Sequence, residues 1–174
     1  MCIRDRDFPG RRVLDWALLL PLAMPAYVLA FVVVQGLDYA GPVQTVLRQW
    51  WPGFSGFSAR HPFWVIATLS LVFYPYVYML ARLAFLTQGR AVMEQARLLG
   101  RGPWAAFFQV ALPMARPAIA AGLALALMET LADFGAVSVF NFDTFTTAIY
   151  KSWYGLFNLA AAAQLASLLL LFVL

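Results

Sequence analysis

Charged residues are scarce in this sequence of 174 residues. They make up 11% of the chain, whereas about 25% is usual for a soluble domain, and apolar residues make up 63%. A soluble protein of this length could not bury so much apolar surface, because more than half of its residues would lie on the outside. We therefore expect lipid to solvate the chain, which excludes a soluble enzyme and a nucleic-acid-binding domain.

Cysteine, histidine and lysine are nearly absent. Cys2 and His61 are solitary, so we expect no disulfide scaffold, no structural zinc or other metal, and no haem or other cofactor. A phosphate-binding loop requires a Gly-rich run that ends in Lys-Ser or Lys-Thr, but the single lysine, Lys151, follows a tyrosine. The sequence therefore contains no catalytic residues for ATP hydrolysis by that mechanism, and ATP-driven work would need a partner.

Long apolar runs are abundant instead. A membrane-spanning helix needs about 20 mostly apolar residues, and four runs meet this requirement. They predict an all-α, polytopic transmembrane helix bundle, with spans at Trp16–Val34, at Pro62–Ala81, from Pro117 to about Phe134, and at Ser152–Leu174.

The basic residues predict the orientation of these spans. Nine of the twelve lie before the first span or at and between the ends of spans two and three. Because basic residues favour cytoplasmic loops, we expect residues 1–12 and the loop 87–116 to be cytoplasmic. Residues 38–61 and about 135–151 then face outward, and tryptophans near the outer ends of the spans fit an interfacial belt: Trp50, Trp51, Trp64 and Trp153.

Both ends of the chain are atypical. Met1–Arg6 resembles a translated sequencing-adapter scar, and Leu174 lies inside an apolar run with no basic residue after it. We therefore expect residues 13–174 to be one transmembrane domain that is truncated at its C-terminus.

The loop 87–116 is patterned like a folded element. On a helix over 90–101, one glutamate and three arginines fall on one face, as either a solvated surface or a docking surface. Gly100 is placed to cap this helix, and a second short helix is expected over Trp104–Leu112, ended by Pro113. Connections between helices are commonly two to eight residues long, so this loop exceeds what a connector needs.

Ionisable groups inside the third span are candidates for function, because burying one in lipid costs about 2.5 to 3.5 kcal/mol on insertion scales. Glu129 and Asp133 lie four residues apart on one helix face. Both could line a translocation path. Alternatively, they reach the outer interface or hold neighbouring helices together. For Asp133 the two interpretations are equally strong.

Two tyrosines of the second span, Tyr74 and Tyr78, share a face near mid-span. They could line the same path, although packing with a hydroxyl bonded to a neighbouring helix is the stronger interpretation. The small residues Ala118, Gly122 and Ala126 predict close helix packing. Asp143 or Thr144 is placed to cap a short outer helix that runs to about Trp153.

The loop also resembles the "EAA" signature of membrane subunits of ATP-binding-cassette (ABC) importers. The matching positions, with glutamine replacing the family's first alanine, are Glu94, Gln95, Ala96, Gly100, Val110, Leu112 and Pro113. The resemblance implies a type I importer transmembrane domain whose coupling helix docks on a separate cytoplasmic ATPase dimer.

Other segments are similar to the first half of ferric-iron ABC permeases: Leu20–Val28, Leu37–Gln44, Tyr74–Tyr78, Met128–Gly135 and Phe142–Thr147. This resemblance implies an inner-membrane iron permease with an extracytoplasmic solute-binding protein and a second permease half. Asp133–Ala136 is also close to the sulfate and molybdate permeases. A permease for thiamine, an aminophosphonate or sulfate is therefore the alternative, followed by a non-transporting membrane scaffold.

Overall fold

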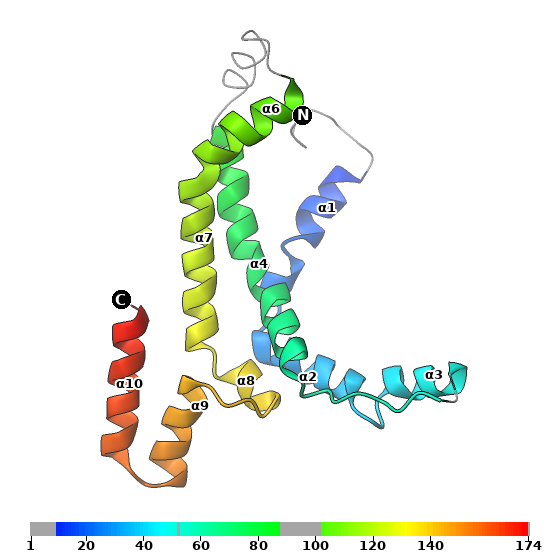
Figure 1. Ribbon diagram of the computed structural model, residues 1–174, viewed down its shortest axis with the longest axis vertical. Helices are drawn as coiled ribbons and strands as arrows, with labels where there is room; N and C mark the ends of the chain where they lie inside the picture. Colours follow the sequence, from blue (N-terminus) through cyan, green and yellow to red (C-terminus); the bar gives the residue numbers. More distant parts are fainter. Residues whose placement is uncertain (1–9, 52, 88–101, 174) are drawn as a thin grey trace. The chain divides into compact units, whose positions relative to one another are not determined.

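The computed structural model describes residues 10–51, 53–87 and 102–173 (Figure 1). This part of the chain contains helices and no strand, which confirms the predicted all-α class. Three stretches are long and apolar enough to cross a membrane: Ala26–Trp50, Pro62–Thr87 and Trp104–Ala132. The chain divides into two compact units.

The first unit consists of the described parts of Met1–Pro21 and Phe73–Leu127. It contains α1 (Arg11–Ala17), the C-terminal half of α4 (Pro62–Thr87), α6 (Pro103–Ala106) and most of α7 (Leu112–Ala132). α7 approaches α4 closely at Gly122, where an added Cβ would lie 2.8 Å from the Cα of Val77. The small-residue pattern at Gly122 is thereby confirmed as a site of close helix packing.

The second unit consists of Leu22–Val72 and the described part of Met128–Leu174. Its helices are α2 (Ala26–Leu37), α3 (Pro42–Trp50), the start of α4, α8 (Gly135–Val139), α9 (Phe145–Tyr150) and α10 (Leu159–Val173). α8 packs on α2, with Gly135 against Tyr27, and buries Val137 and Phe140.

The predicted first span, Trp16–Val34, is wrong as one continuous helix. α1 ends at Ala17, a 3-10 turn occupies Leu20–Ala23, and α2 begins only at Ala26. The physical reason is the pair Pro21 and Pro25, each of which lacks a backbone N–H and clashes with the preceding helical turn. The helix after this break continues to Leu37.

A tight corner separates α2 from α3. The Gly41 N–H donates to the Asp38 carbonyl at 2.8 Å. A Cβ at Gly41 would lie 2.5 to 2.9 Å from three backbone carbonyl oxygens, so no other residue fits this turn without a shift. The apolar stretch Ala26–Trp50 is therefore two helices rather than one.

The second span is confirmed and is longer than predicted, because α4 continues past Ala81 to Thr87 with Pro75 inside it. The third begins earlier than predicted, and Pro113 does not end the preceding helix. α6 passes through a π-turn at Phe107–Ala111 directly into α7. In this wider turn Leu112 N–H donates to the Phe107 carbonyl, five residues back, which relieves the clash that a proline ring makes in a regular α-turn.

The predicted fourth span, Ser152–Leu174, begins too early. A π-turn covers Lys151–Gly155, and Phe157 then adopts a left-handed φ of 51°, which a right-handed helix cannot continue through. α10 starts at Leu159, where the Asn158 side chain accepts the N–H of Ala161 at 3.0 Å. α10 has 15 residues, so it is shorter than the three stretches named above.

Candidate functional site

Asp133 lies at the junction that follows α7. Its carboxylate accepts the backbone N–H groups of Ala136 at 3.0 Å and Val137 at 3.2 Å, in the first turn of α8. The first N–H groups of a helix have no partner within the helix, so the acidic side chain supplies one and also complements the positive end of the helix dipole. The geometry favours the interpretation of Asp133 as a residue that holds the architecture.

Thr146 extends this junction to α9. Its hydroxyl donates to the backbone carbonyl of Asp133 at 2.7 Å. Asp133 therefore connects three segments, with its carboxylate on α8 and its carbonyl on α9. Because unpaired backbone groups are costly in apolar surroundings, these contacts explain how the chain can break its helix twice within a few residues here.

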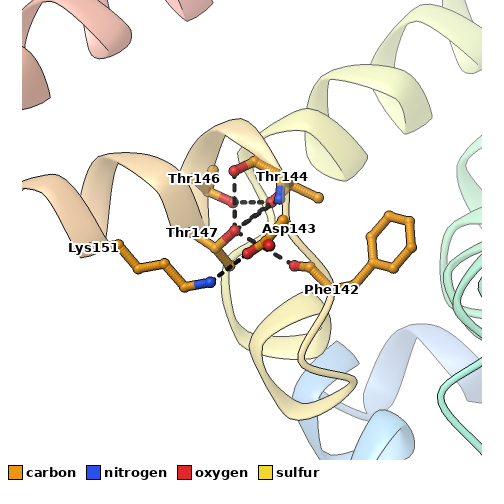
Figure 2. Close-up of polar contacts among 6 residues, drawn as sticks. All are labelled: Phe142, Asp143, Thr144, Thr146, Thr147 and Lys151. Carbon is orange, nitrogen blue, oxygen red and sulfur yellow. Dashed lines mark hydrogen bonds and ion pairs between the residues drawn. The ribbon is translucent and has the colours of Figure 1, made fainter. Parts of the chain in front are cut away.

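Threonines also organise the start of α9 (Figure 2). The Thr144 N–H donates to Thr147 Oγ1 at 2.7 Å, and the two residues form a capping box. Of the two predicted caps, Thr144 is therefore confirmed. Asp143 precedes α9 and instead pairs with Lys151, which directly follows it, and both side chains are exposed. The predicted outer helix ends at Tyr150 and continues as the π-turn to Gly155.

Glu129 differs from Asp133 although it lies only one turn earlier on α7. Its side chain is exposed, and among the described residues it has no hydrogen-bond or ion-pair partner. A carboxylate that no neighbouring helix in this part of the chain neutralises is available to water or to a solute. Its predicted place in a translocation path stays a prediction.

Tyr74 and Tyr78 belong to the first unit, whereas Glu129 and Asp133 belong to the second. The Tyr74 hydroxyl donates to the Leu18 carbonyl at 2.8 Å, at the end of α1. This contact bears out the predicted hydroxyl bond to a neighbouring helix. Tyr78, one turn further along α4, is half-buried, and no polar contact is recorded for it within the described residues.

Aromatic side chains cluster where α6 enters the π-turn. Phe107 stacks on Phe85 of α4 with ring centroids 5.9 Å apart, and Phe108 lies edge-on to Phe107 at 5.1 Å. Trp104 stacks on Phe108 at 6.2 Å and is 76% exposed. Phe107 is thus packed on α4, whereas Phe108 and Trp104 are exposed.

The residues predicted for the coupling loop are only partly described. Val110 lies in the π-turn, and Leu112 and Pro113 lie in the first turn of α7; all three are half-buried. Glu94, Gln95, Ala96 and Gly100 lie outside the described residues, as does the expected helix over 90–101.

Two polar contacts were not found from the sequence. Arg82 pairs with Asp15 at 3.0 Å, which links α4 to α1. Opposite charges at the same end of two antiparallel spans were a usable signal for this pair. Gln44 is completely buried on α3 and donates to the carbonyls of Leu37 and Phe57, both at 2.7 Å. No local pattern indicates these partners, because Phe57 is 13 residues away.

Comparison with known proteins places this arrangement among transport proteins. Residues 3–174 match the family model described as "Binding-protein-dependent transport system inner membrane component". The chain is 32% identical over 133 residues to the molybdenum transport system permease protein ModB of Escherichia coli, a match that covers 76% of this chain and 57% of ModB.

Two further relatives carry other names. The Fe(3+)-transport system permease protein FbpB 2 of Haemophilus influenzae is 29% identical over 164 residues, covering 94% of this chain and 28% of that protein. A probable sulfate transport system permease protein, cysT of Nephroselmis olivacea, is 29% identical over 133 residues, covering 76% and 45%. The chain therefore spans less than two thirds of each of these relatives.

Proposed function

Because this chain belongs to the family of binding-protein-dependent transport system inner membrane components, we propose that it is the membrane-spanning permease part of an ATP-driven ABC importer. The family match over residues 3–174 is the observation that carries this proposal. In this role the protein is a multi-pass inner-membrane protein. It works with a cytoplasmic ATPase dimer, an extracytoplasmic solute-binding protein and a second permease half, and the partner ATPase carries out the hydrolysis.

The coupling surface is proposed to comprise the loop 87–116, with the N-terminal segment 1–12 on the same cytoplasmic side. Glu94 and Gly100 stand at the positions of the importer signature. The chain then enters a helix that runs without a break from Pro103 through the π-turn to Ala132. The exposed Trp104 at the start of this helix offers an apolar contact to the ATPase, and the helix links that contact directly to a membrane span.

The translocation path is proposed to include Glu129, with Tyr78 as a further candidate. Glu129 has an exposed carboxylate and no partner within the described residues. Asp133 and Tyr74 contribute by holding the helices instead, since Asp133 binds α8 and Tyr74 binds the end of α1.

Reconstituting the full-length permease with its ATPase and binding protein in proteoliposomes tests the coupling role. We expect Glu94→Lys and Gly100→Pro to abolish solute uptake while ATP hydrolysis by the ATPase continues. Gln95→Ala is the matched control, because it restores the residue usual in the signature and should leave uptake unchanged. Normal uptake in both coupling variants would refute the proposed docking role.

For the cargo, we propose ferric iron. The iron permease relative aligns with 94% of this chain, and a carboxylate such as Glu129 is an oxygen ligand of the kind that a hard cation prefers. Among the described residues no group of three or more His, Cys, Asp or Glu side chains could hold a metal ion. Glu129 would thus act as a weak contact that releases the ion, as a pathway requires.

An oxyanion is the second candidate cargo. It is favoured by the molybdenum relative, at 32% identity, and by the use of the Asp133 carboxylate for capping α8, which leaves one acidic side chain fewer for a cation. Uptake of radiolabelled ferric iron, with and without excess molybdate or sulfate, separates the two. Iron uptake that is insensitive to both anions supports iron, whereas accumulation of labelled molybdate would replace it. Glu129→Gln should lower iron uptake more than oxyanion uptake.

A further inference from the structure

The helix α3 has the reverse orientation of an amphipathic surface helix in a soluble protein. Its polar residues Gln44 and Arg48 face the rest of its own unit, and its large apolar residues face away. At about 100° per residue, Val43, Val46, Leu47 and Trp50 fall within an arc of about 100° on one side of α3. All four are exposed, and Trp50 is exposed to 85%.

Two side chains, Gln44 and Arg48, hold another face of α3 against the protein. Gln44 is buried and donates to the Leu37 and Phe57 carbonyls, which fixes α3 between the end of α2 and the segment before α4. Arg48, one turn later on the same face, lies 4.0 Å from the ring centroid of Tyr39 and donates to the Tyr39 carbonyl. The Thr45 hydroxyl donates to the Gly41 carbonyl at 2.8 Å. The orientation of α3 is therefore set by its polar side chains.

We propose that α3 lies in the membrane interface and buries its apolar face, defined as Val43, Val46, Leu47 and Trp50, among the lipids of the outer leaflet. Lipid is the occupant that the surroundings favour. The apolar face carries no charge, because the single charged residue of α3, Arg48, is engaged on Tyr39.

The neighbouring surface supports the same occupant. α3 follows α2 and precedes α4 in the chain, and both of these helices expose large apolar side chains, Phe31 and Val32 on α2 and Phe63 and Ile66 on α4. Tryptophan favours the membrane–water boundary, and Trp50 and Trp51 stand together at the end of α3. An amphipathic helix whose apolar face points away from its own unit has the composition of an interfacial helix.

This placement gives α3 a mechanical role that holds for either cargo. A helix anchored in the interface fixes the depth of the outer end of α2. It also fixes the start of α4, because Gln44 joins α3 to the carbonyl of Phe57 in the segment that leads to α4. The corner at Gly41 then acts as a rigid bend rather than as a free linker.

Site-directed spin labelling of the intact membrane protein tests the proposal. Cys2→Ser provides a cysteine-free background, and single cysteines are introduced as Val46→Cys, Trp50→Cys and, on the polar side, Gln49→Cys. The labelled proteins are reconstituted in nanodiscs of phosphatidylethanolamine and phosphatidylglycerol. Collision with oxygen, which concentrates in lipid, and with a water-soluble nickel chelate is then measured by electron paramagnetic resonance.

We expect labels at 46 and 50 to have a ratio of oxygen to nickel accessibility several-fold higher than the label at 49. Equal accessibility to the nickel chelate at all three positions would place α3 in water and overturn the proposal. Immobile labels at 46 and 50 that neither reagent reaches would show that a protein surface covers the face, which also overturns it. Both positions are exposed, so these variants should fold like the parent, and unchanged elution in gel filtration verifies this.

Discussion

The contact between α4 and α7 and the junction of α7, α8 and α9 hold helices together in different ways. At the first, two continuous helices approach so closely that Gly122 faces the backbone of Val77, and packing of small groups is sufficient. At the second, the chain breaks its helix after Ala132 and again after Val139, and side chains of Asp133, Thr146 and Thr147 bind backbone groups. Continuous helices are held together by close packing of complementary surfaces, whereas breaks in a helix need side chains that bind the freed backbone groups.

The most disruptive change should be a large side chain at the close approach. Gly122→Leu places its Cβ 2.8 Å from a backbone atom that cannot rotate away, so we expect a loss of about 3 kcal/mol in stability, at the upper end of overpacking costs. Gly36→Leu, with open space around its Cβ, is the matched control and should be tolerated. Thermal stability in detergent, followed by gel filtration, measures both; an equal effect of the two changes would refute the packing account.

Removing the acceptor at the junction should have the next largest effect. Asp133→Ala leaves the N–H groups of Ala136 and Val137 without their side-chain partner, and we expect a loss of about 2 kcal/mol. Asp133→Asn retains an acceptor oxygen and should lose clearly less. Asp143→Ala removes an exposed ion pair and should change the melting temperature little. If Asn were as damaging as Ala, the charge rather than the hydrogen bonds would explain Asp133.

Removing the Tyr74 hydroxyl, which contacts the end of α1, should lower the stability less. Tyr74→Phe keeps the ring and removes the hydrogen bond to the Leu18 carbonyl, so a loss of about 1 kcal/mol is expected. Tyr78→Phe is the control, since no polar contact of Tyr78 is recorded in the described chain. Measured by the same thermal assay, a larger effect at Tyr78 than at Tyr74 would reverse the assignment.

The smallest effect should come from the ion pair of α1 and α4. Asp15 and Arg82 are each about one third exposed, so water and salt weaken their attraction. A double-mutant cycle with Asp15→Asn and Arg82→Gln should give a coupling below about 1 kcal/mol. The coupling should shrink further as the salt concentration rises, and a salt-independent value would contradict the exposure seen in the structure.

These contacts show which parts of the fold could be predicted from the sequence. α4 was predicted because its apolar run is long and uninterrupted, and the internal Pro75 did not obscure it. The prolines elsewhere had opposite outcomes: Pro21 and Pro25 break the first span, but Pro113 lies inside a helix. The difference depends on the π-turn before Pro113, and a turn with shifted hydrogen bonds leaves no pattern in the spacing of apolar residues.

The candidate site could be predicted from the sequence to a similar extent. The local sequence narrowed the cap of α9 to Asp143 or Thr144, and the bond from Tyr74 to a neighbouring helix followed from a hydroxyl at membrane depth. The bonds from Gln44 to Phe57 and from Thr146 to Asp133 could not be predicted, since each joins residues that are 13 positions apart and depends on how the helices pack. The start of α10 was missed although Asn158, a usual capping residue, marked it.

The π-turn at Phe107–Ala111 has a consequence for how this helix can be engineered. It accommodates one residue more than a regular turn, so Trp104, which precedes it, is rotated by about 100° relative to the membrane span after it. Deleting a single residue there would restore the regular helical phase. Trp104 would then point in a different direction, although it is not itself substituted. Insertions and deletions in this turn would therefore change the direction in which Trp104 points, and point substitutions cannot do this.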